Sequence, residues 1–312
     1  MSGKPTVFIH TNDKQMLGAE VGRWSLKRNS RTPDAFEVEI IRTEDHPFLQ
    51  EREGQTFLRD GAKRVWRMDD LQSFTPLRFL PPELCGYEGR AVVVDPDVFA
   101  VGDVMELLTR DMGGKGVMCR PRAGNVGLGG CLATSVMLMD CARLTHWKAR
   151  ETFASLFRFE ADYMDWICLK LEPRENIGLI EPEWNDFDRL TPQTRLIHNT
   201  KRLTQPWKAG LPIDFAFADK GFHLLEPKSW LKSVKQAASR KTSARHYLSH
   251  PDSRQEALFF GLLKECLEQG LVREEEVRAE MARNHVRHDA FEVLDRTPPL
   301  PPAPGLTPQF FH

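Results

Sequence analysis

The sequence has no long hydrophobic run and no excess charge of either sign. No segment approaches the roughly 18 apolar residues of a membrane-spanning helix, so we expect no membrane span. The 43 Lys and Arg residues nearly balance the 44 Asp and Glu residues, and the formal net charge is -1. Such a chain has no overall electrostatic attraction to nucleic acid or anionic lipid. Any such attraction would have to come from a local basic cluster.

Cysteine is too sparse and scattered to predict a disulfide scaffold or a zinc site. The six cysteines among 312 residues lie at positions 85, 119, 131, 141, 168 and 266. None forms a C-x-x-C pair, and none lies at short ligand spacing from a histidine. We therefore expect reduced thiols, as in cytosolic proteins. Because no basic start with an apolar stretch precedes residue 6, we expect no secretory signal and a cytoplasmic location.

The first 212 residues alternate between strand-like and helix-like patterns, which predicts an α/β domain. Residues 7–9 form a short apolar run, and apolar residues from 16 to 26 have helical spacing. Residues 91–94 are continuously apolar, as in a central parallel strand buried on both faces. Further strands are expected at 36–41, 113–122 and 132–139, and helices at 74–84 (ended by Pro81 and Pro82) and 153–171. Segment 44–67 is expected to be irregular with some helix.

The remaining residues, 213–312, predict a helical C-terminal region. Residues 253–294 have helical spacing, and residues 298–304 form a proline-rich tail. The stretch 228–245 is basic with interleaved apolar residues and is best interpreted as a solvated helix. Alternatively, it contacts anionic lipid or a lipid-linked acceptor, peripherally at the inner membrane face. We expect no nucleic-acid partner, because no recognised binding module accompanies the basic stretch.

Asp95 and Asp97 carry the most informative chemistry. They follow the apolar run 91–94, at the carboxyl end of the predicted strand, where open α/β sheets bind their ligands. Two carboxylates so close repel one another unless a cation bridges them, and hard oxygen ligands favour Mg²⁺ or Mn²⁺. An isolated Asp-x-Asp most often marks a solvated turn. The preceding buried strand favours the metal site.

Several motifs in a fixed order resemble glycosyltransferase family 8, the glycogenin-like and bacterial galactosyltransferase-like group. They cover about residues 5–210: the first strand and loop at 7–13, FTPLRF at 74–79, GYEGRAVVVDPDV at 86–98, SVMLMD at 135–140 with Trp147, LIH at 196–198 and QPWK at 205–208. The resemblance implies a GT-A-like nucleotide-diphospho-sugar transferase fold. Its sheet would be mixed, mostly parallel and flanked by helices, with a helical C-terminal extension.

The resemblance also implies roles for individual residues. Asp95, Asp97 and His198 match the family's ligands for Mn²⁺ (or Mg²⁺). Arg78 and Asp165 match catalytic positions, the latter within Tyr163-Met164-Asp165, where the family has Asp-Gln-Asp. The positions that match donor contacts are Thr11, Asn12, Asp13, Arg78, Asp95, Trp207 and Lys208. Gln205 departs from the family's lysine, so Lys201 or Lys208 could supply the missing phosphate charge.

The resemblance implies transfer of a hexose from a nucleotide-diphosphate sugar, expected to be a UDP-sugar, to a hydroxyl acceptor with retention of anomeric configuration. The acceptor, whether glycan, lipid-linked or protein, stays open. A nucleotidyltransferase of similar fold is one alternative. It would need an N-terminal Gly-rich loop with a catalytic Lys or Arg, which residues 10–19 lack. A non-catalytic nucleotide-sugar-binding protein is the other alternative.

Overall fold

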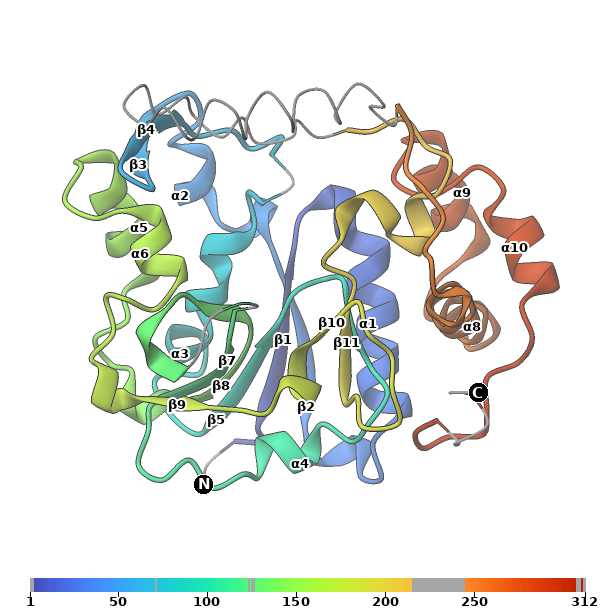
Figure 1. Ribbon diagram of the computed structural model, residues 1–312, viewed down its shortest axis with the longest axis horizontal. Coiled ribbons are helices and arrows are strands. Elements are labelled where there is room, and N and C mark those ends of the chain that lie inside the picture. Colours follow the sequence, from blue (N-terminus) through green and yellow to red (C-terminus); the bar gives the residue numbers. More distant parts are fainter. Residues whose placement is uncertain are drawn as a thin grey trace.

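The computed structural model describes residues 3–70, 72–122, 124, 127–214, 245–306 and 310. A six-stranded sheet forms its centre (Figure 1). In spatial order the strands are β2 (Glu37–Arg42), β1 (Thr6–Thr11), β5 (Arg90–Val94), β8 (Leu132–Asp140), β7 (Val117–Pro121) and β9 (Ile177–Leu179). Strand β8 runs antiparallel to both neighbours, and the other pairings are parallel. The expected mixed, mostly parallel α/β sheet is confirmed.

Both faces of the sheet are buried, which explains the continuous apolar run in β5. Ala91 and Val93 belong to one hydrophobic cluster, together with side chains of α5 (Ala149–Phe157) and α6 (Tyr163–Ile167). Val92 and Val94 belong to another, together with side chains of α1 (Met16–Arg28). Alternate strand residues therefore pack against different helices. Figure 1 shows α1 on one side of the sheet and α5 and α6 on the other.

Smaller elements complete the first two thirds of the described chain. A second sheet has the order β10 (Asp186–Phe187), β11 (Leu196–His198) and β6 (Val98–Ala100), in which β11 is antiparallel to β6. Strands β3 (Thr56–Arg59) and β4 (Ala62–Val65) form a hairpin. The short helices are α2 (Pro47–Gln50), α3 (Pro81–Leu84) and α4 (Met105–Leu108), with 3₁₀ helices that include Thr75–Phe79, Pro182–Asn185 and Pro206–Lys208.

The C-terminal region is helical, as predicted, with α8 (Ser253–Glu268), α9 (Glu274–Ala282) and α10 (Ala290–Arg296). Leu17 and Val21 of α1 share one hydrophobic cluster with Phe259 and Leu262 of α8. The two predicted regions therefore pack together, while the boundary at residue 212 stays a prediction. Among the described residues, no helix is both long and apolar enough to span a bilayer. The basic stretch 228–245 lies outside the described residues, apart from Arg245.

Three predictions of local structure were wrong, each for a local reason. Pro81 begins α3 instead of ending a helix, because the first turn of a helix needs no partner for its backbone nitrogen. The segment 44–67 contains some helix, α2, as expected, but the β3–β4 hairpin was not expected; its turn residues Asp60 and Gly61 both have positive φ, as a type I′ turn requires. The helix expected at 153–171 is interrupted at Phe159, which has φ of 60°.

The expectation of reduced thiols was also wrong for one pair. Cys131 and Cys168 form a disulfide, with their Cα atoms 4.6 Å apart. They are separated by 37 residues in the sequence, and only the packing of α6 beside the start of β8 brings them together. The other four cysteines are free thiols. Because disulfides persist mainly in oxidising compartments, the cysteines do not support the predicted cytoplasmic location.

Candidate functional site

The candidate site lies where β1 and β5 end and β8 begins. The strand register pairs Ile9 with Val94 and Val94 with Val136. Because β8 is antiparallel, its first residues lie beside the carboxyl end of β5. The backbone N–H of Asp95 accordingly donates to the carbonyl of Ser135 at 3.0 Å. The topology thus gathers polar groups from three neighbouring strands at the edge of the sheet where β1 and β5 end, as expected for an open α/β sheet.

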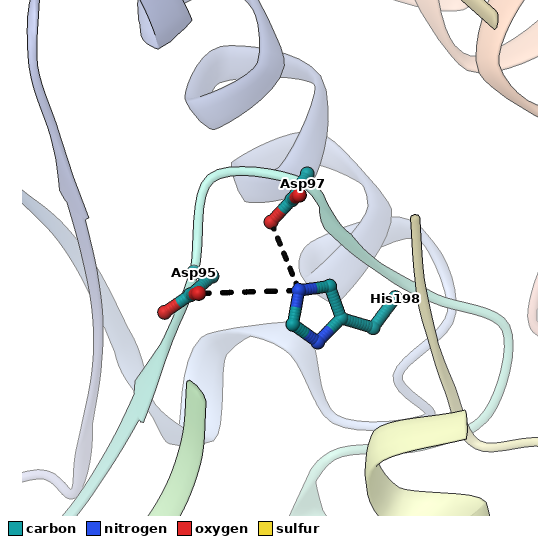
Figure 2. A group of neighbouring side chains, drawn as sticks. All are labelled: Asp95, Asp97 and His198. Carbon is teal, nitrogen blue, oxygen red and sulfur yellow. Dashed lines mark ion pairs between the residues drawn. The ribbon is translucent and has the colours of Figure 1, made fainter. Parts of the chain in front are cut away.

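Asp95, Asp97 and His198 come together at this edge (Figure 2). After Asp95 the chain turns through Pro96 into β6, whose Val98 pairs with His198 of β11. Each of the three residues offers a ligand atom within 4.8 Å of the others. His198 Nε2 lies 3.2 Å from Asp97 Oδ1 and 3.9 Å from Asp95 Oδ2. The second sheet therefore places His198, which the resemblance predicted as a ligand, beside the two aspartates.

A close approach of α1 supports the turn between the two aspartates. A Cβ atom added at Gly18 would lie 2.7 Å from the carbonyl oxygen of Pro96, closer than real Cβ contacts. Only glycine therefore lets α1 pack this tightly against the turn. Together with Pro96, whose ring fixes its own φ, this contact limits the freedom of the backbone between Asp95 and Asp97.

Arg78 and His10 surround the Asp95 carboxylate. The Arg78 guanidinium donates to both carboxylate oxygens, with Nε 2.9 Å from Oδ1, and its Nη1 donates to Thr134 Oγ1 at 3.1 Å. His10 Nε2 lies 3.0 Å from Asp95 Oδ1. Burial alone would raise the pKa of Asp95, but Arg78, His10 and His198 hold that pKa well below its usual range. Asp95 therefore stays ionised near neutral pH.

Two buried amides contact the other members of the triad. Asn185 Oδ1 lies 2.8 Å from His198 Nδ1. Gln205 Nε2 donates to Asp97 Oδ2 at 3.1 Å. Burial would lower the pKa of His198, but the nearby carboxylates of Asp97 and Asp95 outweigh it and raise that pKa. The histidine is thus held between an amide and two acids.

The triad borders a cavity of about 420 Å³. Three cationic side chains line it, Arg78, Arg122 and Arg202, and Phe74 and Phe187 contribute aromatic surface. The other lining residues are Gln15, Gln72, Thr75, Asp95, Pro96, Asp97, Cys131, Leu132, Ala133, Thr134, Ser135, Ile167, His198, Thr200 and Gln205. A volume of this size suits a small polar ligand, and the arginines favour an anionic one.

The donor set of the triad fits a divalent cation. It offers two carboxylates and one imidazole, which suit Mg²⁺ or Mn²⁺. The bidentate contact between Arg78 and Asp95 already offsets one carboxylate charge. The side of the triad that faces the cavity leaves room for ligand oxygens to complete the coordination of a cation.

The predicted nucleoside loop lies next to the cavity without lining it. Among the described residues, the lining includes Gln15 but not Thr11, Asn12 or Asp13. Thr11 is fully buried, and the Asn12 amide donates to Ser73 Oγ at 3.2 Å. Asp13 is exposed and pairs with Arg283 at 3.0 Å. Donor contact by these three residues stays a prediction.

Three other predicted site residues lie away from the cavity lining. Trp207 is 2 % exposed and stacks on Phe259, with ring centroids 4.8 Å apart. Lys208 is fully buried and pairs with Asp214 at 2.8 Å. Asp165 is half-buried on α6 and pairs with Lys170 at 2.7 Å. The structure thus brings none of the three to the triad. Packing and local ion pairs account for where they lie.

Several functional candidates were missed by sequence reasoning. His10 could have been found, because it ends an apolar strand beside the strand that leads to Asp95. Thr134, Asn185 and Arg202 follow no recognisable local pattern. Their approach to the site depends on the pairing of β8 with β5 and of β11 with β6. That pairing is a property of the fold and not of the neighbouring residues in sequence.

Comparisons with known proteins give matches among solved structures alone. No family model and no curated protein matches the chain. The apo glycosyltransferase GlyE of Streptococcus pneumoniae TIGR4 aligns with a TM-score of 0.46 and 16% identity, over 80% of this chain and 66% of that one. This chain therefore spans about two thirds of the length of GlyE.

Two further solved structures are also glycosyltransferases. The galactosyltransferase LgtC, in complex with donor and acceptor sugar analogues, aligns with a TM-score of 0.46 and 11% identity, over 65% of this chain and 89% of that one. The bifunctional glycosyltransferase WbbM aligns with a TM-score of 0.46 and 14% identity, over 67% of this chain and 48% of that one.

Proposed function

We propose that the protein is a metal-dependent glycosyltransferase. It transfers a hexose from a nucleotide-diphosphate sugar, a UDP-sugar, to a hydroxyl acceptor with retention of configuration. The observation that carries the proposal is the convergence of Asp95, Asp97 and His198 on one side of a cavity that also presents Arg78. A site built of two acids, an imidazole and arginines suits a metal–diphosphate complex better than a neutral ligand.

The residues of the triad would hold Mn²⁺ or Mg²⁺. When bound, the cation supplies Lewis-acid neutralisation of the charge on the departing diphosphate. Asp95 is available as an ionised ligand because its pKa lies far below neutrality. Arg78 fixes the direction of the Asp95 carboxylate through its two hydrogen bonds. The acceptor, whether glycan, lipid-linked or protein, is a hydroxyl compound in this proposal.

The cavity arginines would contribute to donor binding. Arg122 and Arg202 line the same cavity as Arg78. Guanidinium groups suit phosphate oxygens because they donate two hydrogen bonds in a plane. In a water-poor site such fixed cations stabilise a leaving group whose charge grows in the transition state. In this proposal the arginines, in place of Lys201 or Lys208, supply the positive charge that binds the donor phosphates.

Calorimetric titration with UDP, with and without Mn²⁺, tests the proposal. We expect the parent protein to bind UDP tightly only when Mn²⁺ is present. Asp97→Asn removes one ligand charge and should abolish most of this Mn²⁺ dependence. Asp34→Asn removes an exposed carboxylate far from the triad and serves as the matched control. Equal UDP affinity in Asp97→Asn and the parent would count heavily against the site.

Turnover separates the proposed enzyme from a binding protein. A glycosyltransferase should hydrolyse its nucleotide sugar slowly when no acceptor is present, because water can take the place of the acceptor hydroxyl. We therefore expect a panel of nucleotide sugars with Mn²⁺ to include one that releases free sugar and UDP. Tight binding of UDP without hydrolysis of any UDP-sugar would favour a non-catalytic protein. Formation of a nucleotide sugar from UTP and a sugar phosphate would favour a nucleotidyltransferase.

A further inference from the structure

Asn185 is a fully buried amide that joins the central sheet to the triad. It is the last residue of the 3₁₀ helix Pro182–Asn185, directly before β10. Its Nδ2 donates to Ser135 Oγ of β8 at 2.9 Å. Its Oδ1 lies 2.8 Å from Nδ1 of His198 in β11. Both ends of the amide are therefore engaged, one with each sheet.

The backbone of Asn185 is anchored as well. Arg120 of β7 donates from Nη1 to the Asn185 carbonyl at 2.7 Å. The same guanidinium lies 4.2 Å from the ring centroid of Phe187. These contacts hold the segment 185–187 against the central sheet, so the direction in which the amide points is set by elements outside the triad. Asn185 does not line the cavity among the described residues.

The contact between Asn185 and His198 determines which imidazole nitrogen is free to bind a metal. An amide oxygen only accepts hydrogen bonds, so the nitrogen that faces it, His198 Nδ1, carries the proton. The other nitrogen, Nε2, then points toward Asp97 Oδ1 at 3.2 Å and is the nitrogen available to a metal. A side chain that donated to Nδ1 would place the proton on Nε2 and block metal binding. An apolar side chain would leave the Nδ1 proton buried without a partner.

We propose that Asn185 is a positioning residue that acts on the metal site through His198. Its Oδ1 accepts a hydrogen bond from Nδ1–H of His198. This bond fixes the orientation of the imidazole ring and directs Nε2 to the point where the two aspartates converge. Asn185 contacts neither metal nor donor. The inference rests on the proposed function for the role of the metal, but the hydrogen bond itself is a property of the metal-free protein.

Three variants test the proposal through Mn²⁺ affinity, measured without nucleotide by electron paramagnetic resonance of free Mn²⁺. Asn185→Leu keeps the size but removes the acceptor, and we expect a roughly 10- to 100-fold weaker affinity, the usual cost of losing such a partner. Asn185→Asp keeps an acceptor and should rescue the affinity, even where its buried charge lowers thermal stability. Asn176→Leu, which removes a partly buried amide contact at the opposite end of β7, should bind Mn²⁺ like the parent.

A role in packing alone predicts a different pattern. Leu and Asp would then weaken Mn²⁺ binding equally, or Asp more, and either result overturns the proposal. Equal Mn²⁺ affinity in Asn185→Leu and the parent also overturns it while leaving the proposed function intact. Comparison of Asn185→Asp with the parent remains decisive if the Leu variant does not fold, because an affinity that falls with an acceptor still in place contradicts the proposal.

Nuclear magnetic resonance of the metal-free protein supplies a readout that does not depend on the proposed function. We expect the Nδ1 proton of His198 to be visible and protected from solvent exchange in the parent and in Asn185→Asp, and to lose this protection in Asn185→Leu. Absence of a protected Nδ1 proton in the parent overturns the inference. A parent that shows this proton but binds no Mn²⁺ would overturn the proposed function and leave the positioning of His198 standing.

Discussion

At the scale of single residues, the Asp95 carboxylate is the group around which the other polar side chains of the site are arranged. Arg78, His10 and His198 all lie against its carboxylate. These contacts lower the pKa of the acid although it is buried. Arg78 contributes most among them, because its guanidinium reaches both oxygens and is tied to β8 through Thr134. The arginine therefore orients the carboxylate of a proposed metal ligand and also adds positive charge to the cavity.

Replacement of Arg78 should impair catalysis more than folding. We expect Arg78→Ala to reduce the rate of UDP-sugar hydrolysis by about 10²- to 10³-fold, the usual effect of losing one preorganised donor. Arg78→Lys should fall between this variant and the parent, because an ammonium keeps the charge but cannot bind both oxygens in a plane. Arg143→Ala, on the surface beside Asp140, is the control and should leave the rate unchanged. A fully active Arg78→Ala would contradict the assignment.

Sequence reasoning found the aspartates because their signal is local. An apolar strand followed by Asp95 and Asp97 can be read within seven residues. His198 was found through the resemblance, and only the pairing of β11 with β6 explains its position. Asn185 and Gln205 could not be found in this way, since an amide has no distinctive pattern before its partners are known. Trp207 and Lys208 are buried and do not line the cavity among the described residues, so their contact with a donor stays a prediction.

At the scale of elements, Asp162 connects two segments that lie about a hundred residues apart. It caps α6 by accepting from the Met164 nitrogen at 2.7 Å. It also accepts from the backbone nitrogens of Asp60 and Gly61, in the β3–β4 turn, at 2.9 and 2.8 Å. Burial would raise the pKa of Asp162, but these backbone donors lower it. One carboxylate therefore fastens the hairpin to the helix.

This carboxylate should give a pH-dependent contribution to stability. We expect Asp162→Asn to lower the free energy of unfolding by about 1–2 kcal/mol at neutral pH, because the amide loses charge and cannot accept from all three nitrogens. Since the folded pKa is depressed, the stabilisation is present above the unfolded value of about 3.9 and is lost as the pH falls through the folded value. Urea unfolding at several pH values measures it. If the difference in unfolding free energy between variant and parent stayed constant as the pH fell into the acid range, the result would contradict this explanation.

The disulfide acts at the same scale, because it ties the start of β8 to the end of α6. Cys131 lines the cavity, and Cys168 follows Ile167, whose carbonyl accepts from Thr134 at 2.8 Å. Replacement of both cysteines by serine should lower the free energy of unfolding by about 2–4 kcal/mol. Thermal unfolding with and without a reductant measures this loss. The reductant should destabilise the parent and leave the double variant unaffected. Equal sensitivity of both proteins would contradict a structural role.

At the scale of the whole molecule, helix α8 of the C-terminal region supports the turn that carries Asp95 and Asp97. Gln255 of α8 accepts from the Asn199 amide, and the Asn199 backbone nitrogen donates to the Asp97 carbonyl at 3.0 Å. Arg28 of α1 pairs with Glu265 of α8 at 2.6 Å and donates to the carbonyl of Pro301 in the tail. Helix α8 thus supports both the first helix and the acidic turn. Sequence patterns predicted these helices but gave no sign of what they would pack against.

Trp207 offers a test of this arrangement. Its ring stacks on Phe259 of α8 and meets Phe99 of β6 edge-on, with centroids 5.7 Å apart. We expect Trp207→Ala to lower the free energy of unfolding by roughly 3–5 kcal/mol, and Trp207→Phe to cost less. In the folded Trp207→Phe protein, UDP affinity should match that of the parent, because the ring lies away from the cavity. Loss of UDP affinity in Trp207→Phe at unchanged stability would instead favour direct contact with the donor.

The measurement that tests the account most directly is the location of a bound metal. A crystal soaked with Mn²⁺ and UDP would reveal the cation by its anomalous scattering. We predict a single strong peak within bonding distance of Asp95, Asp97 and His198, with the UDP phosphates on its cavity side. A nucleotide bound without a metal peak at this triad, or a peak that leaves Asp97 and His198 uncoordinated, would contradict the central claim.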